Sequence, residues 1–139
     1  MSLSIRNQLA GTVTAVTRGE VMATVTVRLA GGQDLTAAIT LDAVEELGLV
    51  PGSPVRALVK STEVALATAP VDGLSIRNQL PGAVHEIATG GAMASVKIFI
   101  DGADLTAAIT REAVTDLELT AGTPVVALIK STEVCLATA

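Results

Sequence analysis

The stretch LSIRNQL at residues 3–9 occurs a second time, unchanged, at residues 74–80. The segments 36–40 and 60–64 likewise recur at residues 106–110 and 130–134. Roughly 38 of about 63 aligned positions are identical, which is the signature of an internal repeat. The alignment shifts by one residue only in the turn after Leu29, where a length change is easily tolerated. The sequence therefore predicts two tandem copies of one small domain, residues 1–69 and 74–139, joined by the linker 70–73.

Each copy carries the pattern of a mainly β domain. Residues 4–17 favour an extended chain, and residues 22–29 and 35–40 alternate apolar and polar side chains, as half-buried strands do. Thr40 can cap a short helix that Gly48 ends. Two further strands are expected at residues 55–59 and 64–67. Three strands, a helix and two strands match a five-stranded, OB-like β-barrel, so we expect two such barrels in tandem.

The composition limits how such small domains can be stabilised. Hydrophobic residues make up 50% of the 139 residues and charged residues 17%, yet no apolar run is long enough for a transmembrane helix. About 70 residues per copy is near the lower limit for a self-sufficient core. The single Cys135, which we expect to be buried, excludes an intrachain disulfide, and the single His85 makes a zinc site improbable. Oligomerisation is the remaining route. The N-terminus lacks the pattern of a secretory signal, so a cytoplasmic protein is expected.

The charge and the aromatic content argue against nucleic acid and membrane surfaces as partners. The formal net charge is −5, and one Phe is the only aromatic residue. Binders of single-stranded nucleic acid need a basic groove and stacking aromatics. Any anion site on this chain must therefore be local and built from a few placed donors.

Three polar features recur in both copies and together form a donor set. Ser4 and Arg6 lie on the expected first strand, where a spacing of two residues puts both side chains on the same face. Lys60 and Ser61 follow the fourth strand, and Thr40 stands at a helix N-terminus. A fully ionised tetrahedral oxyanion accepts hydrogen bonds on every oxygen, so it needs a site of Arg, Lys, hydroxyl and N–H donors without carboxylates. The candidate oxyanion ligands are Ser4, Arg6, Thr40, Lys60, Ser61, Ser75, Arg77, Thr110, Lys130 and Ser131.

The same residues also allow a plainer interpretation. A Ser-x-Arg or Lys-Ser-Thr segment is most often a solvated face, and two copies of recent common origin would share it without any function. A structural assembly module without a ligand therefore stays open as an alternative, and an OB-type nucleic-acid binder is a weaker one. No coupled nucleophile, base and orienting group is present, so we expect no enzymatic activity.

Taken together, Ser-x-Arg-Asn-Gln-Leu, the alternating strand, Ala-Ile-Thr and Lys-Ser-Thr-Glu-Val resemble the Mop-type domain, and the tandem resembles the molbindins, small cytoplasmic molybdate-binding proteins. The resemblance covers residues 2–68 and 73–138. It implies OB-like barrels, a homotrimer whose six domains imitate a hexamer, and molybdate or tungstate bound at domain and subunit interfaces for storage, buffering or homeostasis. No organic cofactor is implied. The Ser and Arg of one domain would face the Lys, Ser and helix-end Thr of another, and Asn7 and Asn78 would belong to a further site near the threefold axis.

Two departures from the family pattern bear on affinity. Ala43 and Ala113 stand where relatives often carry a hydroxyl three residues after the helix-end Thr. Met22-Ala23-Thr24 and its copy from Met93 replace a frequent Asn-Ala-Glu. Some sites are therefore expected to differ in affinity or occupancy from those of relatives.

Overall fold

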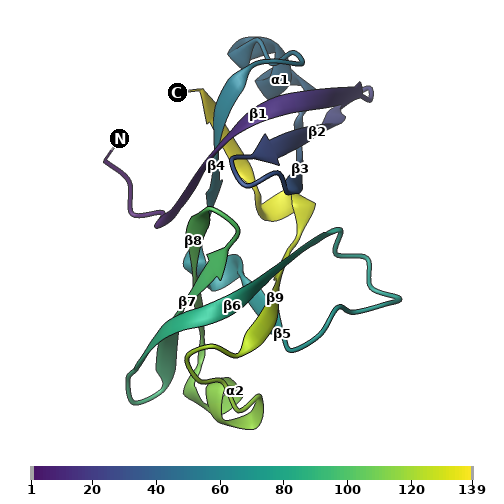
Figure 1. The fold of residues 1–139 in the computed structure, drawn as a ribbon. Coiled ribbons are helices and arrows are strands. Elements are labelled where there is room, and N and C mark those ends of the chain that lie inside the picture. Colours follow the sequence, from purple (N-terminus) through teal and green to yellow (C-terminus); the bar gives the residue numbers. More distant parts are fainter. Residues whose placement is uncertain (1, 139) are drawn as a thin grey trace.

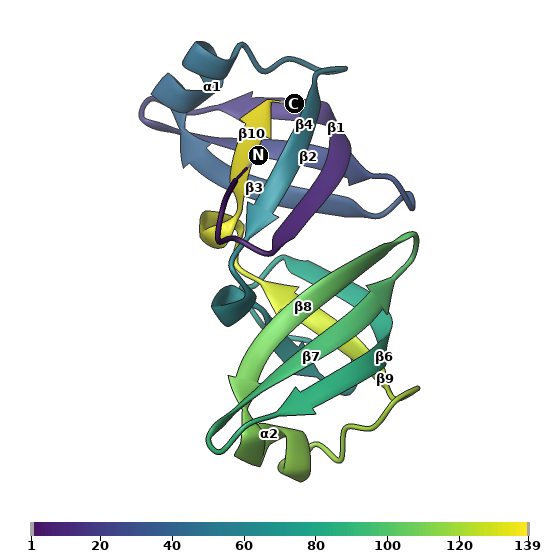
Figure 2. The same cartoon turned by 90° about the vertical axis from the view of Figure 1, so that its left-hand side faces the viewer.

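The computed structural model describes residues 2–138 and shows two β-rich bodies stacked end to end, with a short helix at each outer end (Figures 1 and 2). Each body is one curled sheet of five strands. The predicted fold, mainly β with two five-stranded OB-like units and one short α-helix in each, is confirmed.

The two repeats fold into matching elements. The first repeat contains β1 (Asn7–Arg18), β2 (Met22–Leu29), β3 (Asp34–Thr40), α1 (Leu41–Leu47), β4 (Pro54–Val59), the 3-10 turn η1 (Ser61–Glu63) and β5 (Ala65–Ala67). The second contains β6 (Asn78–Thr89), β7 (Met93–Ile100), β8 (Ala103–Thr110), α2 (Arg111–Asp116), β9 (Pro124–Ile129), the 3-10 turn η2 (Ser131–Glu133) and β10 (Cys135–Thr138). All strand pairs are antiparallel, and β1 and β6 each carry one register shift, after Val13 and Val84.

Alternation along the strands decides which side chains form the core. In β2 the buried residues are Ala23, Val25, Val27 and Leu29, and the residues between them face outward or are only partly covered. Leu35 at the start of β3 is fully buried, as is its equivalent Leu105 in β8. Because the core is almost wholly aliphatic and branched, it suits the pleated faces of curled sheets.

The helix ends follow the predicted capping. The Thr40 side chain accepts a hydrogen bond from the Ala43 amide, and Gly48 ends α1 in the left-handed conformation (φ 63°). In the second repeat Thr110 caps α2 in the same way, but Glu118 stands where the first repeat has Gly48 and adopts a positive φ of 52°. A side chain with a Cβ is strained there, which makes this helix end less favourable than the first.

The fifth strands are exchanged between the repeats. The first sheet has the order β10-β4-β1-β2-β3 and the second β5-β9-β6-β7-β8. The chain leaves the first sheet at η1, so that β5 pairs with β9, and β10 returns from the second repeat to pair with β4. In Figure 2 the yellow β10 lies within the upper body beside β4. The expected boundaries 1–69 and 74–139 thus describe sequence repeats, while each folded body takes one strand from the other repeat.

Cys135 is exposed, not buried as expected, because in β10 it points away from the face that Val134 and Leu136 share. Over residues 2–138, no helix is long and apolar enough to cross a membrane. The same residues contain no group of three or more His, Cys, Asp or Glu side chains that could hold a metal ion.

Candidate functional site

The ladder between β1 and β4 brings the first donor set together. Its last pair is Asn7 opposite Val59, so Arg6 and Lys60, the next residue on each strand, lie beside one another just beyond it. There they line a hollow of about 260 Å³, which we call the first pocket; its lining is Ser4, Ile5, Arg6, Lys60, Ser61 and Thr62.

The second repeat builds the same arrangement. Asn78 pairs with Ile129 at the end of the β6–β9 ladder, so Arg77 and Lys130 meet in turn. The second pocket, about 280 Å³, is lined by Ser75, Ile76, Arg77, Lys130, Ser131 and Thr132. The structure therefore brings eight of the ten predicted oxyanion ligands into two equivalent pockets. The Lys and Ser of each pocket come from the same repeat as its Ser and Arg, not from another domain as the resemblance implied, because the β1–β4 and β6–β9 ladders are formed within one repeat.

The lining of both pockets consists of donors and one aliphatic side chain. Each has one guanidinium, one ammonium and three hydroxyls, and neither has a carboxylate. Glu63 is outside both linings, but it shares a neighbouring hollow with Thr62 of the first pocket and with Lys130 of the second. The charged groups of each lining are thus both cationic hydrogen-bond donors, which is the chemistry that binds a multiply charged oxyanion.

One hydroxyl of the first pocket has no protein partner. The Ser61 Oγ is buried, and among the described residues it is the only buried side-chain nitrogen or oxygen without a hydrogen bond. A buried polar atom left unpaired costs about 1–3 kcal/mol. Because Ser61 lines the first pocket, its hydroxyl is a candidate donor to an acceptor bound there.

Arg6 is partly held by its own segment. Its guanidinium donates to the carbonyl of Leu3, and its Nε lies 3.3 Å from the Ser4 carbonyl. Arg6 and Lys60 are nevertheless exposed in the single chain, as are Arg77 and Lys130. Interactions of exposed charges are weakened by solvent and salt, so a strong oxyanion site would require another surface to cover the pocket.

Thr40 and Thr110 lie outside these pockets and cap the two α-helices. Each hydroxyl oxygen accepts an amide hydrogen bond of 3.1 Å, from Ala43 and Ala113 respectively. A hydroxyl that accepts in this way still has its proton to donate. Their expected place opposite the Ser and Arg of another domain stays a prediction.

Asn7 and Asn78 connect the two bodies. The Asn7 side chain donates to the Thr106 carbonyl and accepts from the Thr106 amide, both at 2.8 Å, and Asn78 makes the same two bonds, also at 2.8 Å, to Thr36. Each asparagine is only 3% exposed. Sequence reasoning missed this role, although an asparagine at a core position of a strand in both repeats was the available signal. The predicted threefold-axis site at these residues is untested by a single chain.

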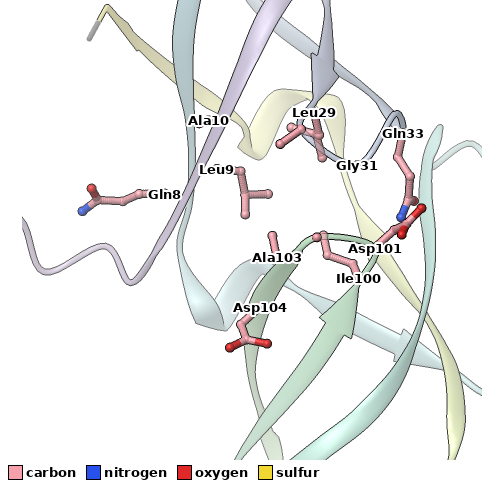
Figure 3. Close-up of a pocket in the computed structure, with 12 residues that line it drawn as sticks. Gln8, Leu9, Ala10, Leu29, Gly31, Gln33, Ile100, Asp101, Ala103 and Asp104 are labelled. Atoms are coloured by element: carbon pink, nitrogen blue, oxygen red, sulfur yellow. The ribbon is translucent and has the colours of Figure 1, made fainter.

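Another cavity, of about 260 Å³, lies between the bodies where the β2–β3 and β7–β8 hairpins meet (Figure 3). Leu9, Leu29 and Ile100 form its apolar part, and the polar ends of Gln33 and Asp101 lie near one another at its rim. Since its only charged lining groups are the carboxylates of Asp101 and Asp104, it is unsuited to an oxyanion.

Comparison with known proteins identifies the family. The TOBE domain model matches twice, over residues 3–66 and 74–136. The chain therefore belongs to the TOBE domain family, as a tandem of two such domains.

Among its relatives, the molybdenum-pterin-binding protein MopB of Rhodobacter capsulatus is 44% identical over 136 residues, which is 96% of this chain and 50% of that protein. The molybdenum transport protein ModE of Herbaspirillum seropedicae is 37% identical over 139 residues, 99% of this chain and 52% of that protein. The chain thus spans about half the length of these relatives.

A solved structure shares the entire fold. The cytoplasmic molybdate-binding protein ModG, with molybdate bound, superposes with a TM-score of 0.96 at 39% identity, covering 100% of both chains. With MopB, this match confirms the resemblance to tandem Mop-type proteins that the sequence motifs indicated.

Proposed function

We propose that this chain binds molybdate, or the similarly shaped tungstate, at the first and second pockets and serves in molybdenum storage, buffering or homeostasis. The observation that carries the proposal is the first pocket itself, where Arg6, Lys60 and the unpaired Ser61 hydroxyl converge with no carboxylate beside them. Molybdate at neutral pH is a tetrahedral dianion that only accepts hydrogen bonds, so this donor set fits it. The names of MopB and ModG support the same ligand.

The full proposed ligand set includes Thr40 and Thr110, which lie outside the two pockets of a single chain. Thr40 and Thr110 would reach the pocket of a neighbouring subunit, with the hydroxyl proton that their helix caps leave free. Asn7 and Asn78 would contribute to a site near a threefold axis through the second N–H of each amide nitrogen, because the bonds to Thr106 and Thr36 use only one of the two. Neighbouring chains would supply the remaining donors.

A homotrimer accounts for the open pockets and for the exposed apolar surface. Val21 is 72% exposed, Met22 45%, Val50 54% and Met93 49%, which is unusual for large apolar side chains in such an aliphatic protein. A neighbouring subunit that also covered the two pockets would desolvate their cations and strengthen the attraction of these cations for a dianion. We place this assembly in the cytoplasm, with no nucleic acid or membrane as partner, no enzymatic turnover and no organic cofactor.

Native mass spectrometry with and without molybdate tests this proposal directly, because it reports the number of subunits and of bound ions. A trimer that gains ions of the mass of molybdate is the expected result. An oligomer that gains none would support the alternative, a structural module without a ligand. A monomer at micromolar concentration would overturn the assembly and the interfacial sites with it.

Substitutions then assign the pockets. Arg6→Ala or Lys60→Ala should cost roughly 2–5 kcal/mol of binding free energy, the usual loss when one partner of a desolvated charge pair is removed. Arg18→Ala is the matched control, because Arg18 is exposed at the far end of β1 from Arg6 and contributes only screened attraction. Calorimetric titration measures both. Molybdate binding that survives in the quadruple variant Arg6→Ala, Lys60→Ala, Arg77→Ala, Lys130→Ala would refute the assignment.

A further inference from the structure

We propose that Asn7 and Asn78 are positioning residues that hold the arginine of each pocket in place by bonding its strand to the opposite body. The inference rests on the proposed function, because it concerns how the same two pockets are pre-organised. It starts from the reciprocal amide bonds between each asparagine and one threonine backbone of the other body.

Each asparagine stands directly beside the pocket it serves. Asn7 follows Arg6 in the chain and pairs with Val59, the residue before Lys60. The first pocket therefore lies directly beyond the Asn7–Val59 pair that ends the β1–β4 ladder. A shift of Asn7 displaces Arg6 through one peptide unit, and no other element separates them.

The Asn7 side-chain amide forms the pair of backbone hydrogen bonds that a neighbouring strand would form with β8. β8 is the outer strand of its sheet, and its inner edge pairs with β7, where Thr106 lies opposite Lys97. The amide and carbonyl of Thr106 instead bond to the Asn7 side chain, so this amide occupies the position a further strand would take. Buried backbone groups left unpaired are costly. The bonds therefore fix both Thr106 and the start of β1.

The other wall of the first pocket is anchored on the same strand. The turn η1, which carries Ser61, packs against β8, and η2 packs against β3 in the other half. Hence both sides of the first pocket, the Arg6 segment and the Lys60–Ser61 turn, rest on β8 of the opposite body. The second pocket rests in the same way on β3, through Asn78 and η2.

Pre-organisation of this kind leaves the number of hydrogen-bond donors in the pocket unchanged and raises the affinity for the ion. A rigid donor needs less ordering when the ion binds, so binding is tighter than at a mobile donor. Supporting residues around bound metal ions commonly change affinity by about 10- to 100-fold when they are removed. We expect an effect of that order for each asparagine, restricted to its own pocket.

The test uses the full chain and calorimetric titration with sodium molybdate in two backgrounds. Lys130→Ala disables the second pocket, so the titration measures binding at the first. Lys60→Ala disables the first pocket, so the titration measures binding at the second. Asn7→Ala should weaken binding about tenfold in the Lys130→Ala background and only slightly in the Lys60→Ala background, since it supports Arg6 alone. Asn78→Ala should show the reverse. Equal losses in both backgrounds would indicate general destabilisation and overturn the proposal, as would no loss in either.

A measurement on the unaltered chain keeps the proposal testable if these variants do not fold. On adding molybdate, hydrogen exchange at the Thr106 and Thr36 amides should slow, because a held arginine also holds the asparagine next to it. The Thr120 amide is the matched control, since it too donates to a side chain, the Thr123 hydroxyl at 3.0 Å, in a turn remote from both pockets. Unchanged protection at Thr106 and Thr36 while molybdate binds would refute the positioning role. If molybdate does not bind at all, the proposed function itself fails.

Discussion

The contact between the two bodies leaves no room for a side chain at Gly31, and this makes a quantitative prediction possible. A Cβ at this position would lie 1.8 Å from the Asp101 carbonyl oxygen and 2.8 Å from its carbonyl carbon. Non-bonded atoms need roughly 3.5 Å, so Gly31→Ala forces the β2–β3 and β7–β8 hairpins apart by about 1.7 Å. Both hairpins border the cavity between the bodies, so the separation loosens the packing of Leu29 and Ile100 there.

We expect Gly31→Ala to lower the free energy of unfolding by about 1–3 kcal/mol, the usual cost of overpacking a close contact. Urea denaturation followed by circular dichroism measures it through the transition midpoint. Because β5 and β10 are exchanged, neither body can keep its sheet complete while the other unfolds. The loss should therefore appear in one common transition.

The control for this experiment is Gly91→Ala, in the turn between β6 and β7. No atom lies within 4 Å of a Cβ there, and the backbone conformation is one that alanine can adopt. Its effect should stay within about 0.5 kcal/mol. If Gly31→Ala proved as stable as Gly91→Ala, the close contact between the hairpins would not exist in solution, and the reasoning would be wrong.

Two further predictions concern local features. Glu118→Gly should raise stability by about 0.5–1 kcal/mol, because glycine adopts the positive φ of this helix end without a Cβ penalty; a lower thermal midpoint than that of the parent chain would contradict this. The second concerns the exposed Arg28–Asp34 pair, whose Nε and Oδ1 atoms are 2.9 Å apart. The hydrogen bond from Arg28 lowers the pKa of Asp34. The pair's contribution to stability is therefore fully present above the pKa of aspartate in the unfolded chain and is lost as the pH falls from there through the lowered pKa. In Arg28→Ala the pKa of Asp34, followed by NMR titration of its carboxyl carbon, should rise, and an unchanged pKa would show that the pair does not form in solution.

Much of the fold follows from local patterns in the sequence. The repeat fixed the number of similar units, and alternation in residues 22–29 placed their buried face correctly. The Thr40 cap and the Gly48 end of α1 were predictable because each depends on a few neighbouring residues. Cys135 was placed wrongly, since β10 is short and its apolar neighbours on both sides hid the alternation.

The donor pockets were only partly predictable. The residue types indicated an oxyanion, but that Arg6 lies beside Lys60 depends on the register between β1 and β4, two strands far apart in the sequence. The unpaired hydroxyl of Ser61 and the bonds from Asn7 to Thr106 depend on the three-dimensional surroundings of each side chain. No sequence pattern describes those surroundings.

By itself, the sequence determined that this protein is a tandem of two small aliphatic β domains with a repeated set of oxyanion donors, because periodicity, capping and donor chemistry are local properties. Only the tertiary structure decided which sheet each fifth strand completes. The segments after the two 3-10 turns, Ala-Leu-Ala-Thr and Cys-Leu-Ala-Thr, are nearly identical and would present the same apolar face to β4 or to β9. The local energies of pairing with β4 or with β9 are therefore almost equal for the two segments. What selects the exchange is the path of the chain through η1 and η2 and the packing of those turns on the opposite body. The exchange in turn places both pockets at the junction of the two repeats.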